Sequence, residues 1–292
     1  MFPEYDEPLF RPPCEAGSLI IQATLGCPHN ACTFCAMYKT KRFRAREPEE
    51  VKADLRRARL MYSHVPSIFL ADGNTVAMNS DKLADIISYA RRLFPEAERI
   101  SSYGGARFLK GKSPQALERL REAGLDIIYL GLESGDDEIL RRANKGVTSG
   151  DMVEAARRVK EAGILLSVYV LLGLGGMERW EQHALNTART LNLMQPHFIR
   201  PRTFYPVPGT ELWEEIGRGE FTEADGVTVM RELRLMLENL DVEGAHFLSD
   251  HISNYVPVHG RLNRDLPQML ATVDMALSRP KEFLGPRHLT HL

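Results

Sequence analysis

Short apolar runs alternate with longer amphipathic stretches through the first 210 residues or so of the chain. Most of the runs are apolar almost throughout, which is typical of parallel strands covered on both faces. They start roughly every 30–40 residues, the repeat of a βα unit. The predicted strands are Ser18–Thr24, Ser67–Ala71, Arg99–Tyr103, Asp126–Leu132, Leu165–Leu172 and Phe198–Phe204. Six units predict an α/β fold, a partial (β/α)6 TIM-like barrel two units short of a closed eight-stranded barrel.

Helix signals lie between these strands. Pro48 is followed by two glutamates, which suits a helix N-terminus and its dipole. Ser113-Pro114 supplies a cap and a first helical position, and Gly124 ends the same helix. The remaining predicted helices of the array are Asp81–Phe94, Asp136–Ala143, Ser149–Ala162 and Glu178–Met194, with the first running over Pro48–Tyr62.

The rhythm changes after about Thr210. Helices are predicted over Glu211–Arg218, Thr222–Leu240 and Asp265–Leu277, with an irregular stretch around His246–His259. No Ser/Gly-rich linker separates the two parts, so independent motion is not indicated. We expect a core domain over residues 15–212 and a helical C-terminal extension over residues 213–292 that packs on it.

Charge and hydropathy exclude some classes of partner. Lys and Arg number 37 against 39 Asp and Glu, a net charge of −2, so nucleic acid is an unlikely partner. The longest mostly apolar run, Ile164–Leu172, is too short to span a bilayer. The acidic, Pro-interrupted start, Met1–Glu7, is unlike a secretion signal. We therefore expect a cytoplasmic protein with no membrane partner.

Three of the four cysteines fall between Cys27 and Cys35, in the loop after the first predicted strand. Loops at the carboxyl ends of parallel strands form the active face of such folds. Three thiolates can hold three irons of a [4Fe–4S] cube and leave the fourth open, whereas closed ferredoxin clusters use four cysteines. A zinc site with His29 or Cys14 as fourth ligand is the alternative. The open cluster is favoured because zinc sites usually come from two separated ligand pairs. If Cys14 is not a metal ligand, we expect it to be a free thiol.

The segment Cys32-Thr33-Phe34-Cys35 matches the second half of CxxxCx(aromatic)C, and the chain thereby resembles the radical SAM superfamily. Four residues, one more than usual, separate Cys27 from Cys32. The resemblance covers about Ser18 to Thr210 and points to the coproporphyrinogen-oxidase-like and related stand-alone branches. It implies a [4Fe–4S] cluster on Cys27, Cys32 and Cys35, which are thus both the metal ligands and the catalytic residues, and S-adenosylmethionine (SAM) as cofactor.

The same resemblance implies contacts to SAM. Phe34 would lie against the adenine, and the backbone around Gly73, in Ala71-Asp72-Gly73-Asn74, would hold the methionine amino group. Glu133 would contact the ribose hydroxyls, and Lys145 would face the methionine carboxylate. The rest of the expected set is Asn74, Ser102 and Gly173, the last in an apolar-Gly motif that flanks adenine.

These residues also have plainer interpretations. Glu133 could cap the following helix or pair with Arg141, although its place at a strand end favours ribose binding. Lys145 could be a solvated lysine that satisfies a helix end. Phe34 could serve packing alone.

Two further segments suggest substrate contacts. The basic run Lys39–Arg46, with Arg44 and Arg46, is either an anion clamp or a loop whose arginines pair with nearby glutamates such as Glu49 and Glu50, and we favour the loop. The segment His246–Tyr255 is polar; it either contacts substrate, with His251 as an acid or base, or satisfies its own backbone, which we favour.

Together these features predict a radical SAM enzyme that cleaves SAM reductively to a 5′-deoxyadenosyl radical, which abstracts a hydrogen from an unidentified substrate. Flavodoxin or ferredoxin is the expected electron donor. The alternatives are a non-catalytic Fe–S or zinc binding module and a haem carrier. We expect no auxiliary cluster, because a second cysteine group is missing. We also expect no N-terminal cobalamin domain, because the first strand begins near Ser18.

Overall fold

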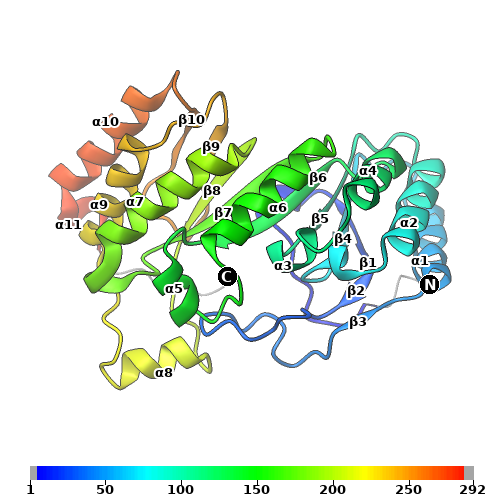
Figure 1. Ribbon diagram of the computed structural model, residues 1–292, viewed down its shortest axis with the longest axis horizontal. Helices are drawn as coiled ribbons and strands as arrows, with labels where there is room; N and C mark the ends of the chain where they lie inside the picture. Colours follow the sequence, from blue (N-terminus) through cyan, green and yellow to red (C-terminus); the bar gives the residue numbers. More distant parts are fainter. Residues whose placement is uncertain (1–4, 286–292) are drawn as a thin grey trace. The chain divides into compact units, whose positions relative to one another are not determined.

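The computed structural model describes residues 5–285 (Figure 1). The first residues of the acidic start, and His288 and His291, to which the sequence assigns no role, lie outside them. The chain divides into two compact units. Unit 1 comprises the chain up to Asn30, Met37–Leu130 and Arg157–Leu166. Unit 2 comprises Ala31–Ala36, Gly131–Ala156 and the chain from Ser167 onward.

Unit 1 is built on parallel strands with helices beside them. Its strands are β1 (Leu19–Gln22), β4 (Ser67–Ala71), β5 (Arg99–Tyr103) and the first residues of β6 (Ile127–Glu133). The helices α1 (Pro48–Met61), α2 (Ser80–Leu93) and α4 (Pro114–Ala123) lie side by side (Figure 1). Strand β4 is buried along its whole length, as its continuous apolar sequence predicts.

Short elements surround the cysteine loop and the strand ends of unit 1. Strands β2 (Thr24–Leu25) and β3 (Arg44–Ala45) pair antiparallel at either end of the loop. The others are η1 (Pro13–Glu15), η2 (Thr75–Ala77) and α3 (Ala106–Leu109). Helix α4 confirms the predicted punctuation, because the Ser113 side chain accepts from Ala116 N–H and Gly124 ends the helix at φ +112°.

Unit 2 contains most of the remaining elements. Its strands are β7 (Leu165–Leu172), which begins in unit 1, β8 (Phe198–Thr203), β9 (His246–Ser249) and β10 (Val258–Arg261). Helix α7 packs on α9, and α9 packs on α10. The helices are α5 (Asp137–Arg142), α6 (Ser149–Glu161), which ends in unit 1, α7 (Gly176–Met194), α8 (Glu211–Gly217), α9 (Gly226–Glu238), α10 (Leu266–Ser278) and α11 (Pro280–Phe283).

The predicted α/β class is confirmed. Within the described residues the main sheet has eight strands in the order β1-β4-β5-β6-β7-β8-β9-β10. The pairings β1–β4, β4–β5, β5–β6, β7–β8 and β8–β9 are parallel, whereas β9–β10 is antiparallel. Residues 5–285 include no helix long and apolar enough to cross a membrane. The cytoplasmic location and the domain boundaries at 15–212 and 213–292 stay predictions.

One local prediction was wrong. The stretch around His246–His259, expected to be irregular, forms β9 and β10, so the C-terminal extension is not wholly helical. Strand β9 pairs with β8 in the register Phe198↔His246, and the two rings stack with their centroids 5.6 Å apart. Pairing with a strand almost fifty residues away creates β9, and the polar local sequence gives no sign of it.

Candidate functional site

The first half of the cysteine loop is attached to the carboxyl end of β4. Gly73 N–H donates to the Gly26 carbonyl at 3.1 Å. A Cβ atom on Gly73 would lie 3.1 Å from Cβ of Cys27 and 2.8 Å from the Tyr38 ring. Only glycine allows this close approach. The structure therefore brings the predicted residue Gly73 against the predicted ligand Cys27.

Asp72 is the residue that holds this attachment. Its carboxylate accepts from Gly26 N–H at 3.0 Å, from the Gln22 amide at 3.2 Å and from Lys41 Nζ at 3.2 Å. Both members of the Lys41–Asp72 ion pair are buried. Burial raises the pKa of Asp72, and the bonds from Gly26, Gln22 and Lys41 oppose that shift only in part. This role was not predicted from the sequence, where the available signal is an acid between an apolar strand and a glycine.

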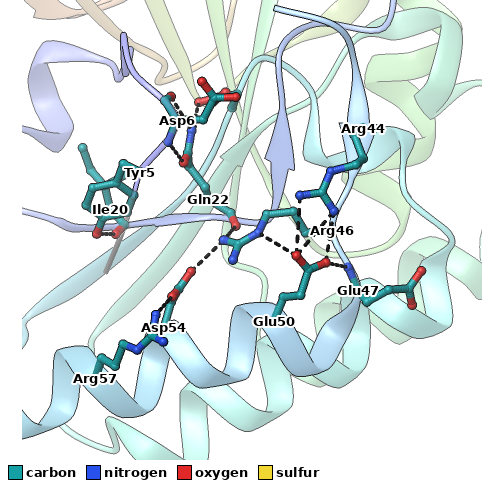
Figure 2. A network of polar contacts seen from close by, with 11 residues as sticks. Tyr5, Asp6, Ile20, Gln22, Arg44, Arg46, Glu47, Glu50, Asp54 and Arg57 are labelled. Atoms are coloured by element: carbon teal, nitrogen blue, oxygen red, sulfur yellow. Dashed lines mark hydrogen bonds and ion pairs between the residues drawn. The ribbon is translucent and has the colours of Figure 1, made fainter. Parts of the chain in front are cut away.

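Arg44 and Arg46, at the end of the basic run after the cysteines, form ion pairs within unit 1, as Figure 2 shows. Arg44 pairs with Glu50 at 3.1 Å, which confirms the favoured interpretation. Arg46 pairs with Asp54 at 2.7 Å and donates to the Gln22 carbonyl at 2.8 Å. These two arginines therefore fix the loop to α1, and the anion-clamp interpretation loses its support.

The second half of the cysteine loop lies on the end of α5. Thr33 N–H donates to the Ala143 carbonyl at 3.1 Å, and the Asn144 side chain donates to the Ala31 carbonyl at 3.0 Å. Asn144 has φ +48°, a left-handed conformation that asparagine tolerates better than most residues. These bonds fix the segment that carries Cys32 and Cys35 beside the residue that follows Asn144, which is Lys145.

Lys145, Glu133 and Phe34 form a compact group in unit 2. Lys145 Nζ lies 2.9 Å from Glu133 Oε1 and 6.0 Å from the centroid of the Phe34 ring. Burial lowers the pKa of Lys145, but Glu133, together with Cys32 and Cys35, outweighs burial and the net shift is upward. A Cβ atom on Gly131 would lie 2.2 Å from Glu133 Oε1, so glycine is needed beneath the pair. The structure thus gathers three predicted residues and adds Gly131.

The structure contradicts the plainer interpretations of Glu133 and Lys145 and supports that of Phe34. The cap of α5 is Asp136, not Glu133, and Arg141 bonds to Glu138. Lys145 is paired, and its side chain is only 18% exposed, so it is not a solvated helix-end lysine. Phe34 does have a packing role, because it lies against an apolar cluster made by Ile139, Ala143, Leu174, Phe204, Leu212 and Phe221.

The backbone of Glu133 is strained. Its φ is +62°, a left-handed conformation that is uncommon for residues other than glycine. Such strain costs about 1–3 kcal/mol and gathers at functional sites, where the surrounding structure enforces it. The conformation sets the direction of the carboxylate that meets Lys145. A motif read from the sequence cannot show this feature, although the following Ser134-Gly135 marks a change of chain direction.

A buried pair of side chains, His183 and Glu232, contacts the ends of β6 and β7. His183 Nδ1 lies 2.9 Å from Glu232 Oε1, and both side chains are 1% exposed. His183 Nε2 lies 3.3 Å from the Glu133 carbonyl, and both Glu232 oxygens accept from Gly173 N–H at 3.1 Å. The pair therefore connects two predicted SAM-binding positions. This pair was not predicted, because a histidine and a glutamate 49 residues apart on two helices carry no joint signal in the sequence.

Asn74 and Ser102 are both buried in unit 1. Within the described residues Asn74 Oδ1 is a buried acceptor that lacks a hydrogen-bond donor. Such an atom is costly to leave unbonded, so Asn74 suits a ligand that donates. Ser102 lies in the middle of the sheet, and its hydroxyl donates to the Tyr103 carbonyl at 3.4 Å. Their roles in binding SAM stay predictions.

His251 and Cys14 were singled out on weaker grounds. Burial, then the nearby Arg202, lowers the pKa of His251 to about 4, so the ring is neutral at pH 7. Its Nδ1 lies 2.8 Å from the Ser253 hydroxyl, which agrees with a loop that satisfies its own polar groups. Cys14 is an exposed free thiol whose Sγ lies 3.4 Å from the Tyr129 hydroxyl, within unit 1.

The residues present fit an iron–sulfur cluster and SAM in chemical type. Cys27, Cys32 and Cys35 form no disulfide and are partly exposed on one loop, and thiolates are the ligands that such clusters use. Asn74 offers an acceptor and Lys145 a cation. Across residues 5–285 the structure draws together no set of three metal-ligating side chains, so the cluster ligands stay a prediction.

Comparison with known proteins finds one matching family model, described as the radical SAM superfamily, over residues 21–188. The chain is 28% identical over 249 residues to 4′-phospho-dehydrooxetanocin synthase of Priestia megaterium, which covers 77% of this chain and 33% of that protein. This chain therefore spans about a third of the length of that relative.

Solved structures share the fold. Methylornithine synthase aligns with a TM-score of 0.54 at 17% identity, over 92% of this chain and 83% of that one. The radical S-adenosylmethionine methyltransferase TsrM of Kitasatospora setae, solved with cobalamin and a [4Fe–4S] cluster, aligns with a TM-score of 0.56 at 18% identity, over 69% and 39%.

Proposed function

We propose that this chain cleaves SAM reductively. The family model of the radical SAM superfamily matches more than half of the chain, so the chain belongs to that superfamily and is an enzyme. The superfamily implies a [4Fe–4S] cluster and SAM, and we assign the cluster to Cys27, Cys32 and Cys35. When bound, the two cofactors supply a 5′-deoxyadenosyl radical that removes a hydrogen atom from the substrate. An external donor such as flavodoxin or ferredoxin would deliver the electron.

The chain's own residues would bind and orient SAM. Lys145 carries the positive charge suited to the methionine carboxylate, and Glu133 carries acceptors suited to the ribose hydroxyls. Phe34 offers a ring face for adenine. Asn74 Oδ1, buried and unbonded within residues 5–285, suits the methionine amino group. Contacts of this kind would align the reacting atoms of SAM and exclude water.

The observation that carries the proposal is the Lys145–Glu133–Phe34 group beside the Cys32–Cys35 segment in unit 2. The bonds from Thr33 and Asn144 hold that segment against the end of α5. A cation, a carboxylate and a ring therefore lie next to two of the three proposed cluster ligands. The substrate is left open, since one fold hosts many reactions.

Anaerobic reconstitution with iron and sulfide tests this function. After dithionite reduction, the wild-type chain should convert SAM to methionine and 5′-deoxyadenosine, measured by chromatography. Cys32→Ala should lose both the cluster absorbance and the product. The matched control Cys14→Ala, a thiol outside the loop, should keep both.

A second readout isolates the SAM contacts. Lys145→Gln should keep the cluster absorbance and weaken SAM binding about tenfold or more, because one charge-assisted hydrogen bond is lost. Lys281→Gln, an exposed lysine of α11, is the control and should leave SAM binding unchanged. A wild-type chain that binds zinc in place of the cluster and forms no 5′-deoxyadenosine contradicts the proposal.

A further inference from the structure

Strand β8 carries two arginines, Arg200 and Arg202, that form no ion pair with any described residue. Arg200 and Arg202 are two residues apart on one strand, so their side chains share a face and start about 6.6 Å apart. Both are half-buried. Within residues 5–285 neither forms an ion pair, in contrast to Arg44 and Arg46. An anion from outside the described chain would offset the cost of partly burying the two guanidinium groups.

Strand β7 fixes the direction of both side chains. The register Tyr169↔Arg200 places the tyrosine and the arginines on the same face. The guanidinium carbon of Arg202 lies 4.5 Å from the centroid of the Tyr169 ring, and Arg200 Nε donates to the Ser167 hydroxyl at 3.2 Å. An aromatic face stabilises a guanidinium without using its N–H donors. The outer donors of both arginines are therefore held in place and remain available.

The loop after β9 hydrogen-bonds to the end of β8, and within residues 5–285 it provides no carboxylate that forms an ion pair with Arg202. Ser253 Oγ accepts from Thr203 N–H at 3.2 Å, and Asn254 donates to the Pro201 carbonyl at 2.9 Å. His251, which this loop places near Arg202, is neutral at pH 7 because burial and Arg202 lower its pKa to about 4. Asp250, an exposed residue of the same loop, also acts on His251, but within residues 5–285 it forms no ion pair with either arginine.

The arginines also lie near the proposed active face. Arg202 is the penultimate residue of β8, Glu133 ends β6, and Gly173 directly follows β7. The carboxyl ends of parallel strands meet at one edge of a sheet, where such folds bind ligands. A group bound by Arg202 would therefore approach the same edge as the residues proposed to bind SAM.

We propose that Arg200 and Arg202 form a subsite for a phosphate monoester carried by the substrate. Two fixed positive charges match the dianion that a phosphate monoester becomes at neutral pH, whereas a carboxylate or phosphodiester offers one negative charge. Guanidinium donors bind phosphate oxygens in pairs. This inference rests on the proposed function for the identity of the reacting centre and extends it to the class of substrate.

Calorimetric titration of the reconstituted full chain with methyl phosphate tests the subsite, with dimethyl phosphate and acetate as comparison probes. Methyl phosphate should bind at least tenfold more tightly than either. Arg200→Gln and Arg202→Gln should each raise its Kd about tenfold or more, whereas Arg202→Lys, which keeps the charge, should raise it less. Arg231→Gln, an exposed arginine of α9, is the matched control and should leave the Kd unchanged.

Three results would overturn the subsite: an unchanged Kd in both glutamine variants that keep the wild-type circular dichroism, equal binding of acetate, or a loss of SAM affinity as large as the loss of methyl phosphate affinity. The last would assign the arginines to SAM. Failure of the proposed function is separate, because a wild-type chain that binds methyl phosphate through the arginines but yields no 5′-deoxyadenosine retains the subsite.

Discussion

Each unit contains a buried ion pair that supports a loop of the candidate site. In one pair the effect of burial on the pKa outweighs the attraction of the partner, and in the other the attraction outweighs burial. In unit 1, Lys41–Asp72 holds the backbone before Cys27, and burial prevails, so the pKa of Asp72 is raised. In unit 2, His183–Glu232 holds Gly173, and burial lowers the pKa of His183 but the attraction of Glu232 prevails, so the net shift is again upward.

An upward shift has opposite meanings for an acid and a base. For Asp72 it means that the charged form is disfavoured in the folded chain, so the intact Lys41–Asp72 pair adds little net stability at neutral pH, although removing one partner of a buried pair is costly. For His183 it means that the charged form is favoured. The pair of unit 1 therefore serves mainly loop geometry, whereas the pair of unit 2 serves geometry and stability together.

The largest expected effect comes from breaking the pair in unit 1. Asp72→Asn leaves the buried Lys41 ammonium without a counter-charge and should reduce the free energy of unfolding by about 3–5 kcal/mol. Guanidinium chloride denaturation measures the loss. The double variant Lys41→Met/Asp72→Leu removes both charges and should recover most of the stability. A loss below about 1 kcal/mol in Asp72→Asn would show that the pair is not desolvated.

The pair in unit 2 should make stability depend on pH. The folded chain raises the pKa of His183 above its usual 6.5, so it binds this proton more tightly than the unfolded chain does. The stabilisation is complete below about pH 6.5 and is lost as pH rises through the folded pKa, with a slope of at most about 1.4 kcal/mol per pH unit. Denaturation between pH 6 and 9 should show the fall.

The matched variants are His183→Gln and His251→Gln. The first should remove the slope. The second should keep it, because the pKa of His251 is lowered to about 4 and its contribution changes only below pH 6.5. A slope that survives in His183→Gln would assign the pH dependence to another group.

The smallest effect is expected for an exposed pair. Arg44 and Glu50 are 52% and 41% exposed, so Arg44→Gln should change the free energy of unfolding by less than about 1 kcal/mol. Arg46→Gln is the comparison, since it leaves the buried Asp54 carboxylate without its shortest ion pair and should cost more. Equal losses in the two variants would mean that burial does not decide the strength of these pairs.

Local signals were enough for most of the fold. Strands β4, β5 and β7 have the predicted bounds; continuous or nearly continuous apolar runs determine β4 and β7, and the flanking helix signals delimit β5. Strands β9 and β10 were missed because they depend on pairing with distant residues. Glu133, Lys145 and Phe34, to which the resemblance assigns contacts with SAM, lie together in the structure, and their binding of SAM stays a prediction. The residues that support them, among them Asp72, His183 and Glu232, act through burial and contacts across the fold, which a linear sequence does not display.

The place of Glu232 on α9 bears on how this protein can be shortened. A chain ending at residue 212 would keep all three loop cysteines yet lose the acceptor of the Gly173 amide and the partner of His183. It would also lose β9 and β10. The buried Gly173 amide and the buried His183 imidazole would then need water as their hydrogen-bond partner, or the structure around them would have to rearrange. The smallest fragment of this enzyme that keeps these contacts therefore extends through α9, well beyond residues 21–188 that the family model matches.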